Sequence, residues 1–398
     1  MISVGIDVSN GTSTVCILKP CGEFVKKPFL IHHTTDDLFK LTSLVCQLDD
    51  DVRIIIEATG VYHLPLLVYL KSNGLFISVV NPYEMKTYSC RGLRRVKTDR
   101  HDAIKIASYG IDNWHRLKDY NIVEEIYAEL KLLGRRYSHY MKMRIASLLE
   151  LNHLLDYTMP GIKNLIKSTN ELTGKDKLSD FVAEYWHYDN ISRLSEEEFI
   201  FSYSDWAKNK GYRYSKDKAC KIYTLAKSSI PTISSHTPSV KMLLQEAVRI
   251  LREINSSLRR ILTQMQQLAK NLPEYSVVRK MGGVGDLLAS KLIAEIGDVR
   301  RFHSGKALIA YAGIDAPPYQ SGQFIGRERK ISKRGSPYLR KIGYEVMRCL
   351  KSHAAPEDNA VYDFIMKKEL EGKAKRAAKI AGLNKFLRIY YARIMEIY

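Results

Sequence analysis

The feature that most constrains the fold is the order of apolar runs in the first 116 residues. Five runs rich in β-branched residues read as strands, at residues 2–8, 13–18, 23–30, 52–57 and 75–80. Helical patterns lie between and after the later strands, at residues 36–48, 63–72 and 99–116. Because strands that alternate with helices form a sheet covered by helices, the sequence predicts an α/β domain with a mixed sheet.

Four acids occupy special positions on this pattern. Asp7 and Glu57 end two of the strand-like runs, and Asp99 and Asp102 begin a helical stretch. Neighbouring strands present their ends side by side, and residues i and i+3 of a helix share a face. Converging carboxylates repel one another unless cations neutralise them, and their hard oxygen ligands suit Mg²⁺ or Mn²⁺. Two such metal ions side by side often serve phosphoryl transfer on nucleic acid. Taken singly, each acid has an ordinary alternative as a turn residue or a helix cap.

Charge indicates a polyanionic partner. The chain holds 62 Lys and Arg against 43 Asp and Glu, a net charge of +19, and residues 321–398 alone hold 18 against 8. We therefore expect nucleic acid first, a membrane surface second, and much of the phosphate contact near the C-terminus. Six cysteines without a CxxC pair, no signal peptide and no membrane-length apolar run predict a cytoplasmic, nucleoid-associated bacterial protein with free thiols and no membrane partner.

The middle of the chain reads as helical. Residues 121–156 carry Leu and Ile at helical spacing, and residues 161–235 suggest short helices. Residues 240–271 contain a heptad seam, which needs a partner helix. Its members are Leu244, Ala247, Leu251, Ile254, Leu258, Ile261, Met265 and Leu268. The partner is either residues 121–156 of the same chain or a second subunit.

The C-terminal third contains two candidate phosphate-binding features. Residues 278–297 predict a helix-hairpin-helix, in which Gly283 and Gly285 would let backbone N–H groups approach a DNA phosphate. The alternative is a glycine turn that only joins two packed helices.

A Pro-rich loop then carries Ser321 at its tip, and a basic segment follows that could hold a phosphodiester. Its cations are Arg327, Arg329, Lys330, Lys333, Arg334 and Arg340. The alternative is a turn serine beside a loop that binds phosphate without chemistry. Six more cations at 373–388 predict a solvated or nucleic-acid-facing helix.

Several motifs together resemble a known family. The N-terminal part has Gly-Ile-Asp-Val-Ser at residues 5–9, Glu-Ala-Thr-Gly at 57–60 and Lys-Thr-Asp-Arg-His-Asp-Ala at 97–103. The C-terminal part has Tyr-Ala-Gly at 311–313, Ser-Gly at 321–322 and Ile-Ser-Lys-Arg-Gly at 331–335. In order and spacing they look like the DEDD transposases of bacterial insertion sequences, a group that includes the Piv-type DNA invertases.

The resemblance implies a domain plan and a chemistry. Residues 1–118 would form a RuvC-like, ribonuclease-H-like domain, residues 119–272 a helical coiled-coil region with an insertion at 161–235, and residues 273–398 a mainly helical transposase domain. Asp7, Glu57, Asp99 and Asp102 would be the metal-binding tetrad. Ser321 would be the nucleophile that forms a phosphoserine ester with DNA, with Ser332 and Ser336 as weaker candidates.

The resemblance also implies partners. An element-encoded, structured non-coding RNA would pair with target and donor DNA, and dimers would assemble into tetramers whose active sites combine the acids of one subunit with the serine of another. The leading hypothesis is a transposase or site-specific recombinase of an insertion sequence. The alternatives are a Piv-like invertase without guide RNA, a RuvC-like metal-dependent nuclease, and a structural nucleic-acid-binding protein without catalysis.

Overall fold

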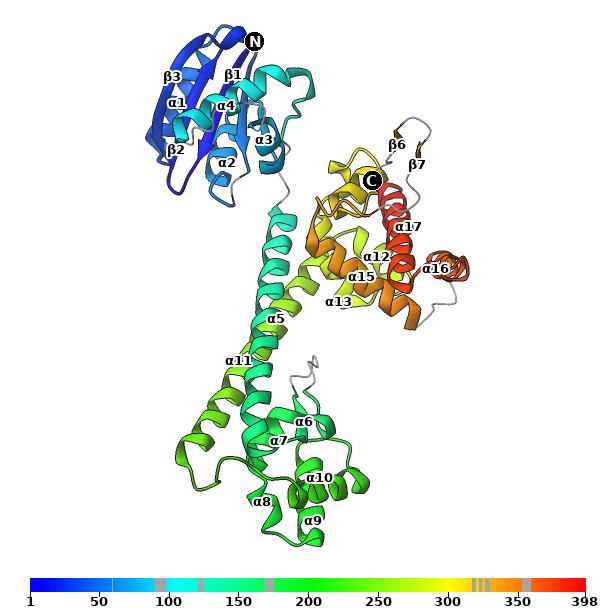
Figure 1. Ribbon diagram of the computed structural model, residues 1–398. Coiled ribbons are helices and arrows are strands. Elements are labelled where there is room, and N and C mark those ends of the chain that lie inside the picture. The colour runs from blue at the N-terminus through cyan, green and yellow to red at the C-terminus, as the bar shows by residue number, and fades with distance from the viewer. Residues whose placement is uncertain are drawn as a thin grey trace. The chain divides into compact units, whose positions relative to one another are not determined.

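The computed structural model describes most of the chain, in two compact units that span Met1–Val123 and Glu124–Tyr398 (Figure 1). The described residues are 1–58, 60–89, 98–120, 125–168, 175–316, 320–321, 324–325, 330–352 and 359–398. Across these ranges, every helix is too short or too polar to cross a lipid bilayer. The finer predicted boundaries, at residues 118 and 272, stay a prediction.

The first unit is built on a five-stranded mixed sheet in the order β3-β2-β1-β4-β5. Strand β1 pairs antiparallel with β2 and parallel with β4; β2 pairs antiparallel with β3, and β4 pairs parallel with β5. The strands span Ile2–Val8, Thr12–Leu18, Phe24–His32, Val52–Glu57 and Ile77–Val80. The predicted mixed α/β architecture is therefore confirmed, with strand bounds within about two residues of those expected.

Helices cover both faces of this sheet. Alternate side chains of the strands, among them Val4, Ile6, Ile54 and Ile56, share a buried cluster with α1 (Thr35–Cys46) and α2 (Leu64–Ser72). The intervening side chains face the other way, where α3 (Pro82–Ser89) and α4 (Asp99–Asp112) lie. This two-residue period is the normal property of a strand, and it decides which side chains meet α4.

Helix α3 was not predicted; the expected elements leave a gap between the strand at 75–80 and the helix at 99–116, and Asn81-Pro82 begins that gap. In the structure the same pair begins a helix. The Asn81 side-chain oxygen accepts a hydrogen bond from the Tyr83 amide at 2.9 Å, and proline is well suited to the first helical position, where it needs no amide partner. The expected helix over 99–116 ends at Asp112, and the short 3₁₀ turn Trp114–Arg116 follows it.

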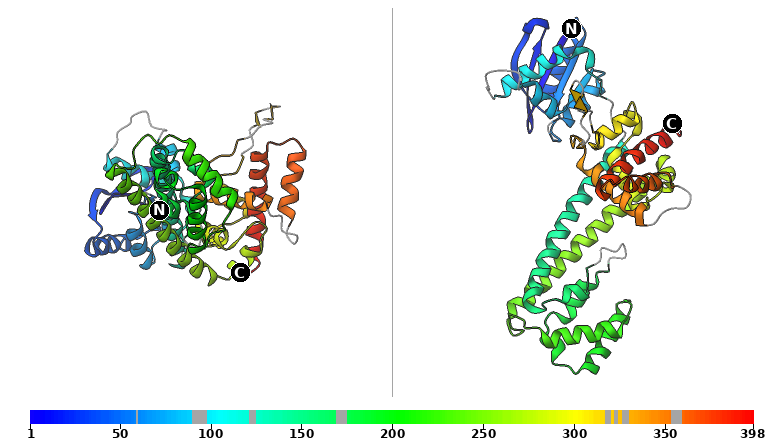
Figure 2. Two further views of the ribbon diagram at one scale, coloured as in Figure 1. Left: turned by 90° about the horizontal axis from the view of Figure 1, so that it is seen from below. Right: turned by 45° about the vertical axis from the view of Figure 1, so that its right-hand side comes forward.

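The second unit contains two long antiparallel helices, α5 (Glu125–Thr158) and α11 (Pro238–Lys270), which lie side by side in both views (Figure 2). The partner of the heptad seam is thus α5 of the same chain. Arg144 of α5 donates from Nε to the Asn255 side-chain oxygen of α11 at 2.8 Å, and both residues are buried. A polar pair inside an apolar seam favours one register of the two helices.

The seam differs from the expected one at three of its eight members. The helix buries Val240, Leu244, Val248, Leu251, Ile254, Asn255, Leu258, Leu262, Met265 and Ala269. The prediction is confirmed at Leu244, Leu251, Ile254, Leu258 and Met265, whereas Ala247, Ile261 and Leu268 are only half-buried. Their places in the seam belong to the next residue along the helix.

The predicted short helices of residues 161–235 form a compact insertion between α5 and α11. They are α6 (Ile162–Leu165), α7 (Lys177–Tyr185), α8 (Asp189–Ser192), α9 (Glu196–Asn209) and α10 (Lys216–Ser228). Their core is largely aromatic, with Phe181, Phe199 and Tyr203 fully buried.

The remaining helices form the C-terminal part of the second unit. They are α12 (Glu274–Lys280), α13 (Asp286–Ile296), α14 (Gly305–Ala312), α15 (Pro337–Ser352), α16 (Ala360–Leu370) and α17 (Lys375–Met395), with a 3₁₀ turn at Val299–Arg301. Two short antiparallel strands, β6 (Gln320–Ser321) and β7 (Phe324–Ile325), lie between α14 and α15. Helix α16 and this strand pair were not predicted.

Candidate active site

Two of the four predicted acids meet at one end of the sheet. Strands β1 and β4 are parallel neighbours, and the pairing of Ile6 with Ile56 brings the next residue on each strand, Asp7 and Glu57, to the same edge. Their neighbours along the strands, such as Ile6 and Ile56, face α1 and α2, so the two acids point to the opposite face of the sheet. They therefore lie on the face that α4 covers, and both are half-buried.

The other two acids come from the first turn of α4. Thr98 caps this helix by accepting a hydrogen bond from the His101 amide at 3.3 Å, which fixes where Asp99 and Asp102 begin. The helix lies unusually close to β1 at Gly5, where an added Cβ would come within 2.3 Å of the Ala107 nitrogen. This close approach brings the first turn of α4 to the acids of the sheet. The sequence prediction did not include Gly5 and Thr98 as supporting residues. A threonine before Asp99 is a readable signal for a helix cap, whereas a glycine inside a strand does not show which element approaches it.

The four carboxylates affect one another. Burial raises the pKa of Asp7 to about 6, and the charges of Asp102, Asp99 and Glu57 add to the increase in that order. Burial also raises the pKa of Glu57, with the charge of Asp102 as the second cause. The structure thus brings together all four acids predicted from the sequence, and their mutual repulsion is centred on Asp7.

The donor set of this acid cluster suits a hard divalent cation. All four groups offer carboxylate oxygens, and the repulsion between them is the kind that Mg²⁺ or Mn²⁺ relieves. In this structure the Lys105 ammonium group partly neutralises the cluster, with its Nζ 3.0 Å from an oxygen of Asp102. Over the residues that the structure describes, no three His, Cys, Asp or Glu side chains are arranged as a ready metal site.

The three candidate serines differ in their surroundings. Ser321 ends strand β6, and its backbone pairs with Phe324 of β7; its side chain lies outside the described residues. The Ser332 hydroxyl donates to a carboxylate oxygen of Asp315. The Ser336 hydroxyl donates to Glu295 at 2.5 Å and accepts from the Leu339 amide at 3.1 Å, which caps α15. Ser332 and Ser336 therefore have structural hydrogen bonds in this arrangement.

The predicted phosphate-binding cations fall into three groups. Arg327 and Arg329 lie outside the described residues. Lys330 and Lys333 are exposed and line a large cavity next to α17, and Arg334 is exposed beside them. Arg340 is half-buried and donates to the carbonyl oxygens of Ala312 and Gly335, both at 3.0 Å. Arg340 thus connects the C-terminal end of α14 to the segment that precedes α15.

The two glycines of the predicted helix-hairpin-helix also differ, and the motif itself stays a prediction. Gly283 has a φ of +78°, and an added Cβ there would come within 2.7 Å of the Leu350 backbone nitrogen, so this position needs glycine for packing. Gly285 is exposed, with open space around it, at the start of α13. A hydrogen-bonded Asp286, 2.6 Å from Arg279, stands next to it.

Comparisons with known proteins agree with the motifs. A DEDD transposase family model matches residues 4–160, and a model described as the transposase IS116/IS110/IS902 family matches residues 275–363. The two regions contain all four acids and all three candidate serines.

Individual relatives match as well. The pilin gene-inverting protein of Moraxella bovis is 24% identical over 349 residues, which cover 87% of this chain and 80% of the relative. The transposase for insertion sequence element IS1111A of Coxiella burnetii is 26% identical over 159 residues, 39% of this chain and 42% of the relative. A probable family 20 transposase of Pseudomonas aeruginosa is 29% identical over 113 residues, 27% of this chain and 32% of the relative. This chain is therefore a DNA-recombining enzyme that belongs to the IS116/IS110/IS902 family of transposases.

Proposed function

We propose that the chain cuts and rejoins DNA through a phosphoserine intermediate, with the acid cluster holding Mg²⁺ or Mn²⁺. The observation that carries the proposal is the convergence of Asp99, Asp102 and Glu57 on Asp7, whose pKa is raised first by burial and then by these three charges. Support for a ribonuclease-H-like fold comes from the strand order 3-2-1-4-5, with three antiparallel strands and two that run parallel to β1.

Each group of residues would have one task. The carboxylates of the acid cluster would hold the metal, which when bound supplies positive charge to the scissile phosphate. The Ser321 hydroxyl would attack phosphorus, forming the serine–phosphate bond while the bond to the 3′ oxygen of DNA breaks. In net terms the proton lost by the serine is gained by the departing 3′ hydroxyl. Attack by a 3′ hydroxyl of another strand reverses these changes, and since one ester replaces another, no ATP is required.

Ser321 is favoured over the other two serines by their contacts. Ser332 and Ser336 donate to carboxylates, and Ser336 also caps a helix. Either hydroxyl would have to break these hydrogen bonds before it could attack a phosphate. The cations Arg327, Arg329, Lys330, Lys333 and Arg334 follow Ser321 closely in the sequence, and we propose that they bind the DNA backbone around it.

Metal binding can be tested on Asp7 without any DNA. At pH 7.5 the carboxylate of Asp7 is ionised in the folded protein despite its raised pKa, so burial and the neighbouring charges destabilise the metal-free fold. The upward pKa shift of Asp7 corresponds to roughly 1–2 kcal/mol of lost folding stability at this pH, after an allowance for solvent screening. We expect Asp7→Asn to raise the melting temperature in EDTA and to remove the further increase that Mg²⁺ or Mn²⁺ gives the wild type.

The matched control is Asp36→Asn, which removes an exposed carboxylate in the first turn of α1, away from the acid cluster. It should leave the response to metal unchanged. A wild-type protein that shows no stabilisation by either ion, or an Asp7→Asn variant that keeps it, would contradict the proposed metal site.

A guide RNA is the proposal that depends most on the resemblance, and the net charge of +19 supports a polyanionic partner of some kind. We expect the full-length protein to co-purify with one abundant structured RNA encoded beside its own gene. Sequencing the nucleic acid released from the purified protein tests this. Heterogeneous DNA or RNA without an abundant species would favour the second candidate function, which is DNA inversion without a guide RNA. The observation that favours this second function is the pilin gene-inverting relative, which aligns over most of this chain.

We also propose that the chain works as a dimer that assembles into a tetramer on DNA. The heptad seam of α11 already packs against α5 of the same chain, so assembly would use other surfaces.

A further inference from the structure

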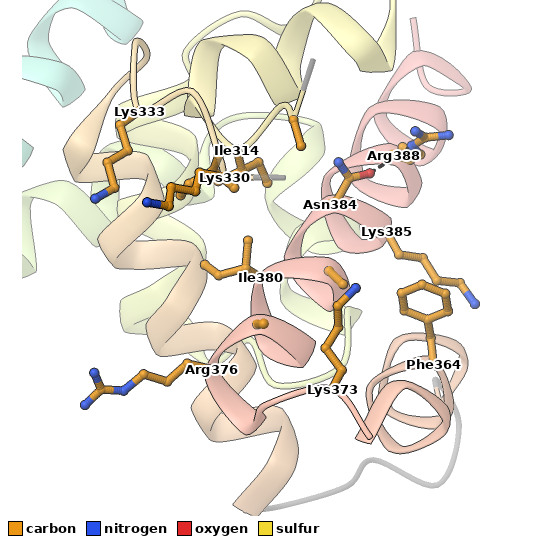
Figure 3. Close-up of a pocket in the computed structure, with 14 residues that line it drawn as sticks. Ile314, Lys330, Lys333, Phe364, Lys373, Arg376, Ile380, Asn384, Lys385 and Arg388 are labelled. Carbon is orange, nitrogen blue, oxygen red and sulfur yellow. Dashed lines mark hydrogen bonds between the residues drawn. The ribbon is translucent and has the colours of Figure 1, made fainter. Parts of the chain in front are cut away.

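A cavity of about 830 Å³ lies beside α17, and it combines two kinds of lining (Figure 3). Its rim is cationic and is formed by Lys330, Lys333, Lys373, Arg376, Lys385 and Arg388. Its floor is apolar and is formed by Ile314, Ile331, Phe364, Ala377, Ile380 and Ala381. The volume falls in the range of about 300–1,000 Å³ that is usual for small-ligand sites.

The rim has a strong preference for anions. Among the described lining residues there is no Asp or Glu, and within the described chain no carboxylate forms an ion pair with any of the six cations. Several like charges held around one opening repel one another, and an anionic ligand relieves that repulsion. Phosphate groups are the anions that the activity of this enzyme supplies.

The floor requires more than phosphate. Ala377 and Ala381 lie one turn apart on α17 and leave space above the helix, and Ile380 lies between Lys330 and Arg376 in the view of Figure 3. The Phe364 ring stands at the side of the cavity with the Lys385 Nζ 5.1 Å from its centroid. Aromatic rings beside cations are the usual components of sites where bases stack and phosphates are held.

One polar group faces the same space. Asn384 lines the cavity, and its side-chain oxygen accepts a hydrogen bond from the Arg388 Nε at 3.1 Å. Its NH₂ group can therefore donate to the edge of a base. A simple aliphatic or lipid tail would have no use for this donor, whereas a nucleobase would.

We propose that this cavity, the α17 cavity, binds an unpaired nucleotide of a single-stranded nucleic acid, with the base on the apolar floor and the flanking phosphates on the cationic rim. The bases of a duplex are stacked and paired, so a duplex would present only phosphates and leave the floor empty. The proposal rests on the proposed function only in taking nucleic acid as the partner; it requires neither the serine nor the metal.

Binding of the full-length protein to labelled probes in EDTA tests the proposal. The probes are a thymidine single strand of about ten nucleotides, an abasic strand of equal length and charge, and a duplex of equal length. We expect the base-bearing strand to bind at least about fivefold more tightly than the abasic one, because stacking contributes about 1–3 kcal/mol per base. A uridine strand compares RNA with DNA as the source of the nucleotide.

Variants then locate the effect in the α17 cavity. Ala377→Trp fills the cavity from an exposed position, and Ala381→Trp is a second variant that fills it from the next turn. Each should remove the advantage of the base-bearing strand and leave abasic binding within about twofold. Ala392→Trp, exposed on the same helix but outside the cavity, is the matched control. Lys373→Ala with Arg376→Ala should weaken both strands and lower their salt slope by about 1.4.

Three results would overturn the proposal. The tryptophan variants could leave every affinity unchanged, or weaken the abasic strand or the duplex as much as the base-bearing strand, or a polyglutamate peptide could compete as well as the oligonucleotide. Ser321→Ala and Asp7→Asn should bind the probes like the wild type. Failure of the proposed serine chemistry would therefore leave these affinities untouched, and failure of the α17 cavity would leave the covalent adduct intact.

Discussion

Replacing Ser321 with alanine is expected to abolish the covalent protein–DNA adduct completely, while the affinity for the same DNA changes by less than about twofold. The reason is that the proposed nucleophile is one oxygen atom, and no other group in the cycle can take its place as a leaving group. The measurement uses DNA from both ends of the element that carries the gene. The adduct is trapped by denaturation, and the modified residue is identified by mass spectrometry.

The two other serines provide matched controls, because each replacement also removes one hydroxyl from the same domain. Ser332→Ala loses the hydrogen bond to Asp315 and Ser336→Ala loses the cap of α15, at a cost of about 1 kcal/mol each. Both variants should still form the adduct in the folded protein. An adduct that persists in Ser321→Ala and maps to another serine would refute the assignment of the nucleophile.

The N-terminal sheet and its acids were predictable because short-range signals determine them. Runs of β-branched residues give the strands, and the two-residue period of a strand then places Asp7 and Glu57 on the same face once the strands are parallel neighbours. The helical position of Asp99 and Asp102 follows from the cap at Thr98. What the pattern could not give is the close approach at Gly5, because that depends on the contact between two elements about 100 residues apart.

The second unit was less predictable because its contacts join distant segments. The predicted seam of α11 follows the heptad spacing of its apolar residues and includes Ile254. The structure buries Asn255 as well, and Arg144, 111 residues earlier, supplies its partner. Likewise, residues 373–388 were interpreted as a solvated or nucleic-acid-facing surface. Their cavity becomes visible only when the segments around Lys330 and Phe364 pack beside α17.

Gly5→Ala is expected to have the second large effect, because it places a methyl group where α4 crosses β1. The new Cβ would lie 2.3 Å from the Ala107 nitrogen and 2.5 Å from the Ala103 carbonyl oxygen. Both are backbone atoms, so the helix itself must move away from the strand. Overpacking of this kind costs about 1–3 kcal/mol or more. Moving α4 would also carry Asp99 and Asp102 away from Asp7, so the response to Mg²⁺ should disappear even in protein that remains folded.

Gly110→Ala separates these two consequences, because its Cβ would instead meet the Ser3 hydroxyl at 2.2 Å and the Ile55 side chain at 2.5 Å. Side chains can rotate where backbone cannot, so we expect this variant to lose less stability than Gly5→Ala and to retain some metal response. Gly305→Ala, with its nearest neighbours at 3.7 Å, should change stability by no more than about 0.5 kcal/mol.

Hydrogen exchange resolves these effects by segment, which matters because the protein has two units and need not unfold in one step. In Gly5→Ala, amides of β1 and α4 should lose protection, while those of α5 and α11 should not. Wild-type protection in β1 and α4, together with a normal response to Mg²⁺, would show that α4 tolerates a methyl group at this contact. The close packing at Gly5 would then not be what brings Asp99 and Asp102 to the sheet, and the assembly of the acid cluster would need a different explanation.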